Sequence, residues 1–546
     1  MLIRPGSWIG RLAGMSLALG FVHPAAFADE SYSIGKPALA HERFGLFPSK
    51  EFTLATGSCA SCRTAKQALW YFPTDLVAIP THGQDRESMS EAGAPPFMVW
   101  IGSPEVIEKT YLTPDLHHLH LSAHTLTTLA LTPQLATNRS YYNERSAAFF
   151  AQRPIRIRGR TEAGAQGPVF TARTIWPADY VFNETQAIHD ASLSAPSITQ
   201  MIEADQGGAM GTFSTQVLWK RPNQSSTWAG KPVLGLVLNG AQGDDDEAHG
   251  GHFGIFTGRV GPGGEWADWL VNNFYAPDVV SEKGIIPAML PMDNYLYELN
   301  SGQSYYRPSY LLVFVLKQER TAAAYQSAIQ ADFLRLYRHE IDYDHSLANC
   351  AGLSIDALRR LGWQIPLQGS TSRLKAAGAF VCMAVTDRSL ANGRKLYHYF
   401  SEEQTRLLPR ITFEAIARDA LALMQRDPSA TSRSLTDYEE WLQDDIEAIV
   451  FVRIPQVPSD RAFGNYPVAS LDEYQQRVPK DHAQWKTIDL APRPFPDKLR
   501  ATPHTISSRI FLQSPILVGV SLLFIGTLLI AIVTKSSRRR SSKDNV

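Results

Sequence analysis

An uncharged apolar run near the C-terminus constrains this chain more than any other feature. Residues 510–533 read IFLQSPILVGVSLLFIGTLLIAIV and contain no charged side chain. At about 1.5 Å per residue, a helix of this length spans the hydrocarbon core of a bilayer. Lys535 and three arginines at 538–540 follow at once, and basic residues favour the cytoplasmic side. The sequence therefore predicts one transmembrane helix over 510–533 and a basic cytoplasmic tail over 534–546.

The N-terminus has the order of a secretory signal peptide. Arg4 and Arg11 precede an apolar run over residues 12–22, and Ala26-Phe27-Ala28 supplies the small residues of a cleavage site. The apolar run is too short to cross a bilayer. We therefore expect a signal peptide over 1–28. Together the two ends predict a single-pass inner-membrane protein with a large periplasmic domain and a cytoplasmic C-terminus.

Composition narrows the class of protein further. The chain has 546 residues with 52 Lys plus Arg and 53 Asp plus Glu, a formal net charge of −1. A surface that binds nucleic acid normally leaves a basic excess, so we expect no nucleic-acid partner. Hydrophobic residues make up 44% and aromatic residues 10%, which excludes bulk disorder. The four cysteines are too few for a small disulfide scaffold.

Between its ends the chain reads as an α+β protein. Short β-branched or alternating segments separated by Gly and Pro predict a β-rich periplasmic domain over 29–200, with a hairpin that joins 155–160 to 168–175. Strands and helices mix over 201–365, and 366–490 is mostly helical. A proline-punctuated juxtamembrane linker covers 491–509. We also expect strands at 233–238, 310–316 and 448–454 and helices at 321–338, 413–425 and 435–447.

The segment NCAGLSIDALRRLG, residues 349–362, has the features of a helix that begins with a cysteine. Asn349 is a good N-cap, and Gly362 is a good residue to follow the last turn. Cys350 then lies in the first turn, where free N–H groups and the helix dipole favour thiolate and lower the thiol pKa. Cys350 is therefore a candidate nucleophile. The alternative is a small buried hydrophobe at the start of a helix.

A second segment places a histidine on a predicted strand. His252 begins an alternating stretch, Gly261-Pro262-Gly263-Gly264 forms a turn, and residues 265–275 are expected to return. A simple hairpin then sets His252 opposite Asn272 or Asn273, with Cβ atoms about 5 Å apart. A carboxamide there can accept the imidazole N–H and fix its tautomer, as the third member of a Cys-His-Asn set does.

These two segments carry a resemblance to a known group of enzymes. HFGIFTG at 252–258, followed by the segment at 349–362, resembles the circularly permuted papain-like superfamily, which includes permuted NlpC-type cysteine peptidases and lecithin:retinol acyltransferase-like enzymes. The resemblance covers about residues 210–365 and extends to poorly characterised membrane-anchored bacterial proteins. It implies that Cys350 is the nucleophile and His252 the base, with Asn272 or Asn273 as the third polar group. Relatives often have histidine there, and this chain has none between 253 and 338.

The function that this resemblance implies is hydrolysis or acyl transfer through a thioester. The expected substrate is a peptide or lipid of the cell envelope, attacked at an amide or ester bond, with the Cys350 backbone N–H as the first oxyanion donor. No cofactor and no metal are expected. The alternative is a non-catalytic envelope protein in which a papain-like domain is a binding scaffold.

Other cysteines and histidines allow competing interpretations. A disulfide between Cys350 and Cys382 in an oxidising compartment would remove the nucleophile. Cys59 and Cys62 form a C-x-x-C, for which a local disulfide is favoured over a redox dithiol. A zinc site could combine that pair with the histidines of 117–124, although the spacing matches no standard finger. A metal could also bind the acidic run 244–247 together with His249 and His252, although such a run usually forms a solvated turn.

Overall fold

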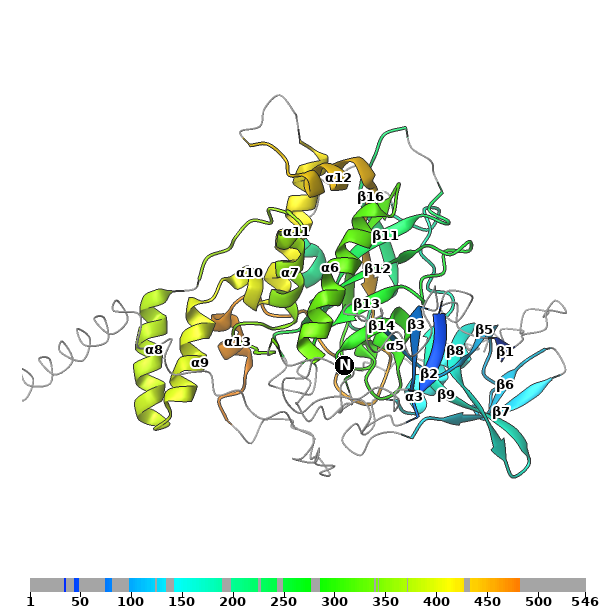
Figure 1. Cartoon of the computed structure of the whole chain (residues 1–546). Helices are drawn as coiled ribbons and strands as arrows, with labels where there is room; N and C mark the ends of the chain where they lie inside the picture. Colours follow the sequence, from blue (N-terminus) through cyan, green and yellow to red (C-terminus); the bar gives the residue numbers. More distant parts are fainter. Residues whose placement is uncertain are drawn as a thin grey trace, which may run out of the picture.

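The computed structural model describes the central part of the chain (Figure 1). The described residues are 34–35, 44–48, 74–80, 98–122, 125–133, 142–188, 198–223, 227–242, 249–275, 285–337, 340–341, 343–370, 372–426 and 433–481. The expected signal peptide, juxtamembrane linker, transmembrane helix and basic tail lie outside them. Within the described residues, no helix has the length and apolar character needed to cross a membrane.

The described chain is a mixed α+β structure with two β-sheets and a helical region. The smaller sheet has six strands in the order β1-β5-β8-β9-β7-β6. All its strands come from the N-terminal 180 residues. Their bounds are β1 Ile34–Gly35, β5 Glu105–Thr110, β6 His118–His120, β7 Leu126–Leu131, β8 Ile155–Gly164 and β9 Gly167–Pro177.

The larger sheet has ten strands in the order β10-β16-β15-β11-β12-β13-β14-β4-β3-β2. Its central strands β11 and β15 are buried along their whole length, as expected for a sheet covered on both faces. The bounds are β2 Phe44–Pro48, β3 Leu76–Pro80, β4 Val99–Gly102, β10 Ser214–Lys220, β11 Pro232–Asn239, β12 His252–Arg259, β13 Leu270–Asn273, β14 Ala288–Pro291, β15 Ser309–Leu316 and β16 Ile446–Ile454.

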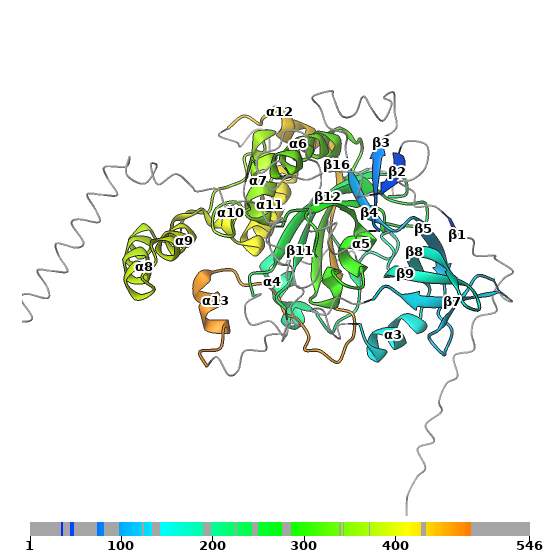
Figure 2. The same cartoon turned by 60° about the horizontal axis from the view of Figure 1, so that its bottom comes forward.

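Helices α6, α7 and α11 pack on strands β11 and β12, and Figures 1 and 2 show them gathered on one side of the large sheet. The α-helix bounds are α3 Glu144–Ala151, α4 Ile198–Glu203, α5 Met292–Tyr297, α6 Arg320–Tyr337, α7 Cys350–Arg360, α8 Arg373–Thr386, α9 Leu390–Ser401, α10 Gln404–Leu407, α11 Pro409–Met424, α12 Asp437–Asp445 and α13 Leu471–Arg477. Two short 3-10 helices, η3 Ala204–Gly207 and η4 Gln303–Tyr305, complete the set.

The elements expected from periodicity and turn signals form close to their predicted positions. Strands β8 and β9 form the expected hairpin, in which Gly164 pairs with Gly167. The predicted strands at 233–238, 310–316 and 448–454 are β11, β15 and β16, and the predicted helices at 321–338, 413–425 and 435–447 are α6, α11 and α12. The fold class is therefore confirmed at the level of a mixed α+β chain.

The large sheet draws strands from three of the regions that the sequence analysis separated. Strands β2, β3 and β4, from the expected β-rich domain, extend one edge through the parallel pairing of Val99 with Met289. Strand β16, from the expected helical extension, lies between β10 and β15. A strand in the middle of a sheet contributes to the core of that sheet. Strand β16, which ends at Ile454, therefore belongs to the same sheet as His252.

Buried ion pairs connect the small sheet to helix α5. Arg158 of β8 donates to both carboxylate oxygens of Asp293, each at 3.0 Å, and both side chains are fully buried. Arg156 also pairs with Asp293 and reaches Asp268 at 2.8 Å. A buried charge is tolerated only when it is paired and hydrogen-bonded. These pairs therefore hold the two sheets in a defined relation.

Candidate functional site

A row of buried polar side chains crosses one end of the large sheet. Asn239, the last residue of β11, pairs with His252 of β12 on one side and with Ser309 of β15 on the other. Directly paired residues project from the same face of a sheet. Asn239 Nδ2 donates to Ser309 Oγ at 2.8 Å, and all three side chains are buried. Polar groups at such a depth persist because they satisfy one another.

His252 and Asn273 form the hydrogen bond on which the site depends. The His252 Nε2 atom lies 2.7 Å from Asn273 Oδ1. The Asn273 Nδ2 atom donates to the backbone carbonyl of Ile286 at 2.8 Å, so the Asn273 oxygen is left as the acceptor. His252 Nε2 then carries the hydrogen, and Nδ1 has a free lone pair. That tautomer is the one in which Nδ1 can act as a base.

The expected cross-strand register is wrong, although one of the two expected partners does contact His252. Ile255 pairs with Asn272, and continuing that register places Asn273 opposite Gly254. The turn is longer than the four residues predicted because a second hydrogen-bonded turn, from Trp269 N–H to Trp266 carbonyl, delays the return strand until Leu270. Asn273 reaches His252 diagonally.

Asn272 belongs to a different set of contacts. Its Nδ2 donates to the Ile255 carbonyl at 3.0 Å. Its Oδ1 accepts from Gln326 Nε2 of α6 at 3.0 Å. Successive residues of a strand point to opposite faces, so Asn272 and Asn273 serve opposite sides of the sheet. Of the two asparagines, Asn273 is the one bonded to the imidazole.

The helix that begins with Cys350 has the predicted caps. Asn349 Oδ1 accepts from the N–H groups of Ala351 and Gly352, each at 3.0 Å. Gly362 follows the last turn with φ +108°, a conformation that favours glycine. Helix α7 packs on β12. This packing brings a segment some hundred residues downstream against the strand that begins with His252.

The Cys350 sulfur lies at the beginning of β12 and is buried. Burial is the largest influence and raises the pKa of the Cys350 thiol above its ordinary value. A hydrogen bond from the backbone N–H of Phe253, the residue after His252, acts in the opposite direction, as do bonds from Tyr343 and from the Ala351 N–H. The expected lowering of the thiol pKa by the helix start is therefore wrong, because desolvation outweighs the helix N–H groups.

Tyr343 contacts the cysteine at two points. The Cys350 backbone N–H donates to the Tyr343 hydroxyl at 3.3 Å, and that hydroxyl also hydrogen-bonds to the Cys350 side chain. The N–H that was expected to stabilise an oxyanion is thus engaged by a tyrosine. Tyr343 packs near Tyr275, with ring centroids 6.1 Å apart. An acyl group bound at this N–H would have to displace the hydroxyl.

Burial also determines the charge of His252. Desolvation, followed by the positive charge of Arg307, lowers the pKa of His252 from 6.5 to about 3, and the hydrogen bond to Asn273 only partly opposes this. The imidazole is therefore neutral at neutral pH. Because the thiol pKa of Cys350 is raised, both the thiol and the imidazole are uncharged at neutral pH. Proton transfer would accompany attack instead of preceding it.

A tyrosine and an arginine extend the polar row beside the imidazole. The Tyr295 hydroxyl of α5 donates to Asn239 Oδ1, and its ring lies 6.4 Å from that of His252. Arg307 donates to the Gln303 side chain and to the Gly240 carbonyl. Its positive charge lowers the pKa of Cys350 as well as that of His252. Arg307 thus favours anionic over cationic species at this end of the sheet.

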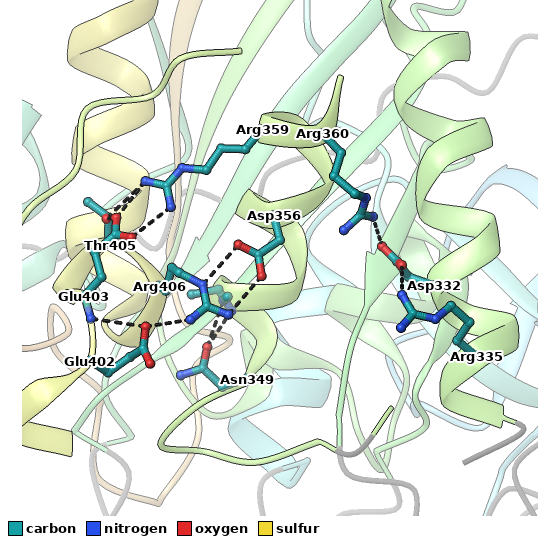
Figure 3. Close-up of polar contacts among 12 residues, drawn as sticks. Asp332, Arg335, Asn349, Asp356, Arg359, Arg360, Glu402, Glu403, Thr405 and Arg406 are labelled. Carbon is teal, nitrogen blue, oxygen red and sulfur yellow. Dashed lines mark hydrogen bonds and ion pairs between the residues drawn. The ribbon is translucent and has the colours of Figure 1, made fainter. Parts of the chain in front are cut away.

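Ion pairs hold helix α7 in place on both sides (Figure 3). Asp356 accepts from Arg406 through both carboxylate oxygens, at 3.0 and 2.9 Å. Arg360, at the end of α7, pairs with Asp332 of α6. Two-point Arg–carboxylate pairs restrict orientation as well as distance. They stabilise the position of α7, and with it that of Cys350.

The structure bears on the disulfide and metal-site interpretations of the other cysteines and histidines. Cys350 and Cys382 both have free thiols, so the disulfide between them is excluded in this structure. Cys382 is exposed on α8. Among the described residues, no group of three or more His, Cys, Asp or Glu side chains is placed to hold a metal. Cys59, Cys62, His124 and the acidic run 244–247 lie outside the described residues.

Sequence reasoning missed several members of the site. Tyr343, Tyr295, Arg307 and Asn239 had no local signal that linked them to Cys350 or His252. Asn239 and Ser309 could have been found as polar residues that end or begin otherwise apolar strands. Tyr343 lies seven residues before Cys350, in the connection that leads into α7.

Comparison with known proteins adds no assignment. No family model, curated protein or solved structure matches this chain. Any function has to be inferred from the residues around Cys350, His252 and Asn273.

Proposed function

We propose that this chain is a cysteine hydrolase or acyltransferase of the cell envelope, built on a papain-like arrangement of cysteine, histidine and asparagine. The observation that carries the proposal is the 2.7 Å bond from His252 Nε2 to Asn273 Oδ1, together with the packing of α7, which begins at Cys350, on the strand that begins at His252. General-base activation of a nucleophile requires an imidazole of fixed tautomer within reach of the thiol, and the proposal is that His252 and Cys350 meet this requirement when substrate binds.

The proposed reaction has two steps. His252 Nδ1 takes the proton of the Cys350 thiol while the sulfur attacks an amide or ester carbonyl, and a C–S bond forms. The imidazolium then gives its proton to the leaving amine or alcohol as the original C–N or C–O bond breaks. Water or an acceptor amine or alcohol, deprotonated by His252, attacks the thioester. The C–S bond then breaks, and the imidazolium returns its proton to the sulfur.

The proposal gives a role to each polar group around Cys350 and His252. Asn273 orients the imidazole and is a positioning residue. Arg307 favours the anionic intermediate through its charge. The Cys350 N–H is the candidate oxyanion donor once the Tyr343 hydroxyl has moved away. The amide or ester would belong to an envelope peptide or lipid, with the chain anchored by residues 510–533.

Burial of the nucleophile favours a second candidate, a non-catalytic envelope scaffold. Cys350 is only 4% exposed, and its thiol pKa is raised. A buried structural cysteine has both properties. In that case the His252–Asn273 bond would serve only to satisfy two buried polar groups.

Covalent labelling separates the two candidates. The purified full chain is treated with a small chloroacetamide probe, and labelled peptides are mapped by mass spectrometry. We expect label on Cys350 in the wild type and in Cys382→Ser, and no label at position 350 in Cys350→Ala of unchanged circular dichroism. His252→Gln should reduce labelling of Cys350 by at least about tenfold, since general-base assistance is typically larger than that. Label on Cys382 alone would favour the scaffold.

A further inference from the structure

Helices α8 and α9 form a hairpin that stands away from the body of the molecule (Figures 1 and 2). The two helices pack closely on one another at Gly393, where a Cβ atom would lie 2.8 Å from the Phe380 carbonyl oxygen and 3.2 Å from its ring. Phe380 and Ala384 therefore mark the face of α8 that is turned toward α9. The opposite face of α8 is turned away from α9.

That opposite face is apolar and open. Leu374, Gly378, Val381, Cys382 and Val385 follow one another at the spacing of a single helical stripe. Leu374 is 69% and Val385 71% exposed, Cys382 is exposed, and a Cβ atom added at Gly378 would meet nothing within 4 Å. Large exposed apolar side chains grouped in this way mark an interaction surface. Leu390, at the start of α9, is 73% exposed as well.

Basic residues lie at both ends of this stripe. Arg373 and Lys375 are exposed near its start, and Arg388 and Lys395 are exposed beyond its end. Over residues 372–401 the hairpin has five basic side chains and one acidic side chain, Asp387. The whole chain, in contrast, has a net charge of −1. The hairpin is thus a local basic patch around an apolar stripe.

We propose that the α8–α9 hairpin docks on an anionic lipid bilayer, with its apolar stripe in the interface and its basic side chains on lipid phosphates. A helix with an apolar face and flanking Lys and Arg residues lies in the plane of such an interface. A second copy of the chain fits this face poorly, because two hairpins packed stripe to stripe would bring their basic ends together.

The course of the chain supports the same partner. The described residues end at Asp481, shortly after α13. Helix α13 lies beside the hairpin in both views (Figures 1 and 2), and Lys375 Nζ reaches Asp472 Oδ2 of α13 at 3.6 Å. Residues 482–509 lead from there to the uncharged run 510–533. The last described residues therefore lie near the hairpin, and the chain continues from them to the apolar run 510–533.

The exposed thiol of Cys382 gives a direct readout. The purified full chain is incubated with vesicles of phosphatidylcholine alone or of phosphatidylcholine with about one third phosphatidylglycerol, a composition that supplies anionic headgroups. The rate of reaction of Cys382 with a bulky, neutral, water-soluble maleimide is measured by peptide mass spectrometry. A Met210→Cys variant supplies a matched reporter, since Met210 is 75% exposed on another part of the described chain.

The expected result is a rate at Cys382 that falls by at least about fivefold with the anionic vesicles and much less with the zwitterionic ones. The rate at position 210 should not change. The double substitution Leu374→Glu with Val385→Glu should restore fast reaction at Cys382. Equal rates at Cys382 in both kinds of vesicle would overturn the proposal. So would protection that grows with protein concentration in the absence of lipid, since that result identifies a second copy as the occupant.

Discussion

The hydroxyl of Tyr343 accepts a hydrogen bond from the backbone N–H of Cys350 at 3.3 Å and also bonds to the cysteine side chain. In the proposed mechanism that N–H is the oxyanion donor. In this structure the candidate oxyanion donor is therefore already occupied by the Tyr343 hydroxyl. The hydroxyl both occupies the donor and lowers the thiol pKa.

Tyr343→Phe should lower the reactivity of Cys350 toward alkylation. The substitution keeps the ring but removes the hydroxyl that stabilises the thiolate. A hydrogen bond to a charged group contributes about 1.5–3 kcal/mol, so we expect the thiol pKa to rise and the alkylation rate at pH 8 to fall at least about tenfold. The measurement is the pH dependence of iodoacetamide reaction at position 350. Faster alkylation in this variant would mean that the hydroxyl acts only as a steric cover.

Acid should destabilise the protein through His252. Its pKa is lowered from 6.5 to about 3 in the folded state, so the unfolded chain binds a proton that the folded chain excludes. The stabilisation is complete above pH 6.5 and is lost as pH falls toward 3. Between pH 7 and pH 4.5 this amounts to about 2–3 kcal/mol. Urea unfolding at both pH values should show a smaller acid loss for His252→Gln than for the wild type by that amount. The same loss in both proteins would contradict the burial of a neutral imidazole.

The two neighbouring asparagines should differ in their effect on the site. Asn273→Ala removes the acceptor that fixes the His252 tautomer, and we expect the labelling rate of Cys350 to fall about 10- to 100-fold. Asn272→Ala is the matched control, because Asn272 is equally buried but bonds to Gln326. Both variants should lose about 1–3 kcal/mol of stability. If Asn272→Ala lowers the labelling rate as much as Asn273→Ala does, the assignment of the orienting residue is wrong.

Loss of a buried carboxylate should have a large effect on stability. Asp293→Asn removes the fully buried one of the two carboxylates that Arg156 and Arg158 share, and leaves these arginines with Asp268. Removal of one partner of a buried pair costs about 3–5 kcal/mol. Glu319→Gln is the control, because its pair with Arg259 is exposed and should contribute at most about 1 kcal/mol. The measurement is the free energy of unfolding of both variants in urea. A similar small loss in both variants would show that the buried pair contributes little to stability.

The sequence was informative where local chemistry decides the structure. Asn349 and Gly362 predicted both ends of α7, because capping depends on residues next to the helix. Alternating and apolar runs predicted strands β8, β11, β15 and β16. The strand register was not predictable, since it depended on an extra turn at Trp266–Trp269. The thiol pKa was predicted in the wrong direction because burial of Cys350 is a property of the tertiary packing on β12.

The remaining members of the site come together only through topology. Tyr343 reaches Cys350 because the connection before α7 folds back over the helix start. Asn239 and Ser309 lie beside His252 because three antiparallel strands end or begin at the same edge. No spacing in the sequence encodes that alignment, since it depends on long-range strand order.

Acyl transfer to sulfur is the most direct test of the account. The full chain is mixed with a small p-nitrophenyl ester, and release of p-nitrophenolate is followed over the first turnover. The account predicts a burst of about one equivalent, with the acyl group on Cys350, that persists in Cys382→Ser and disappears in Cys350→Ser. His252→Gln should slow it at least about 100-fold. Acylation confined to Cys382, or a burst of unchanged rate in His252→Gln, would contradict a nucleophile–base pair at this site.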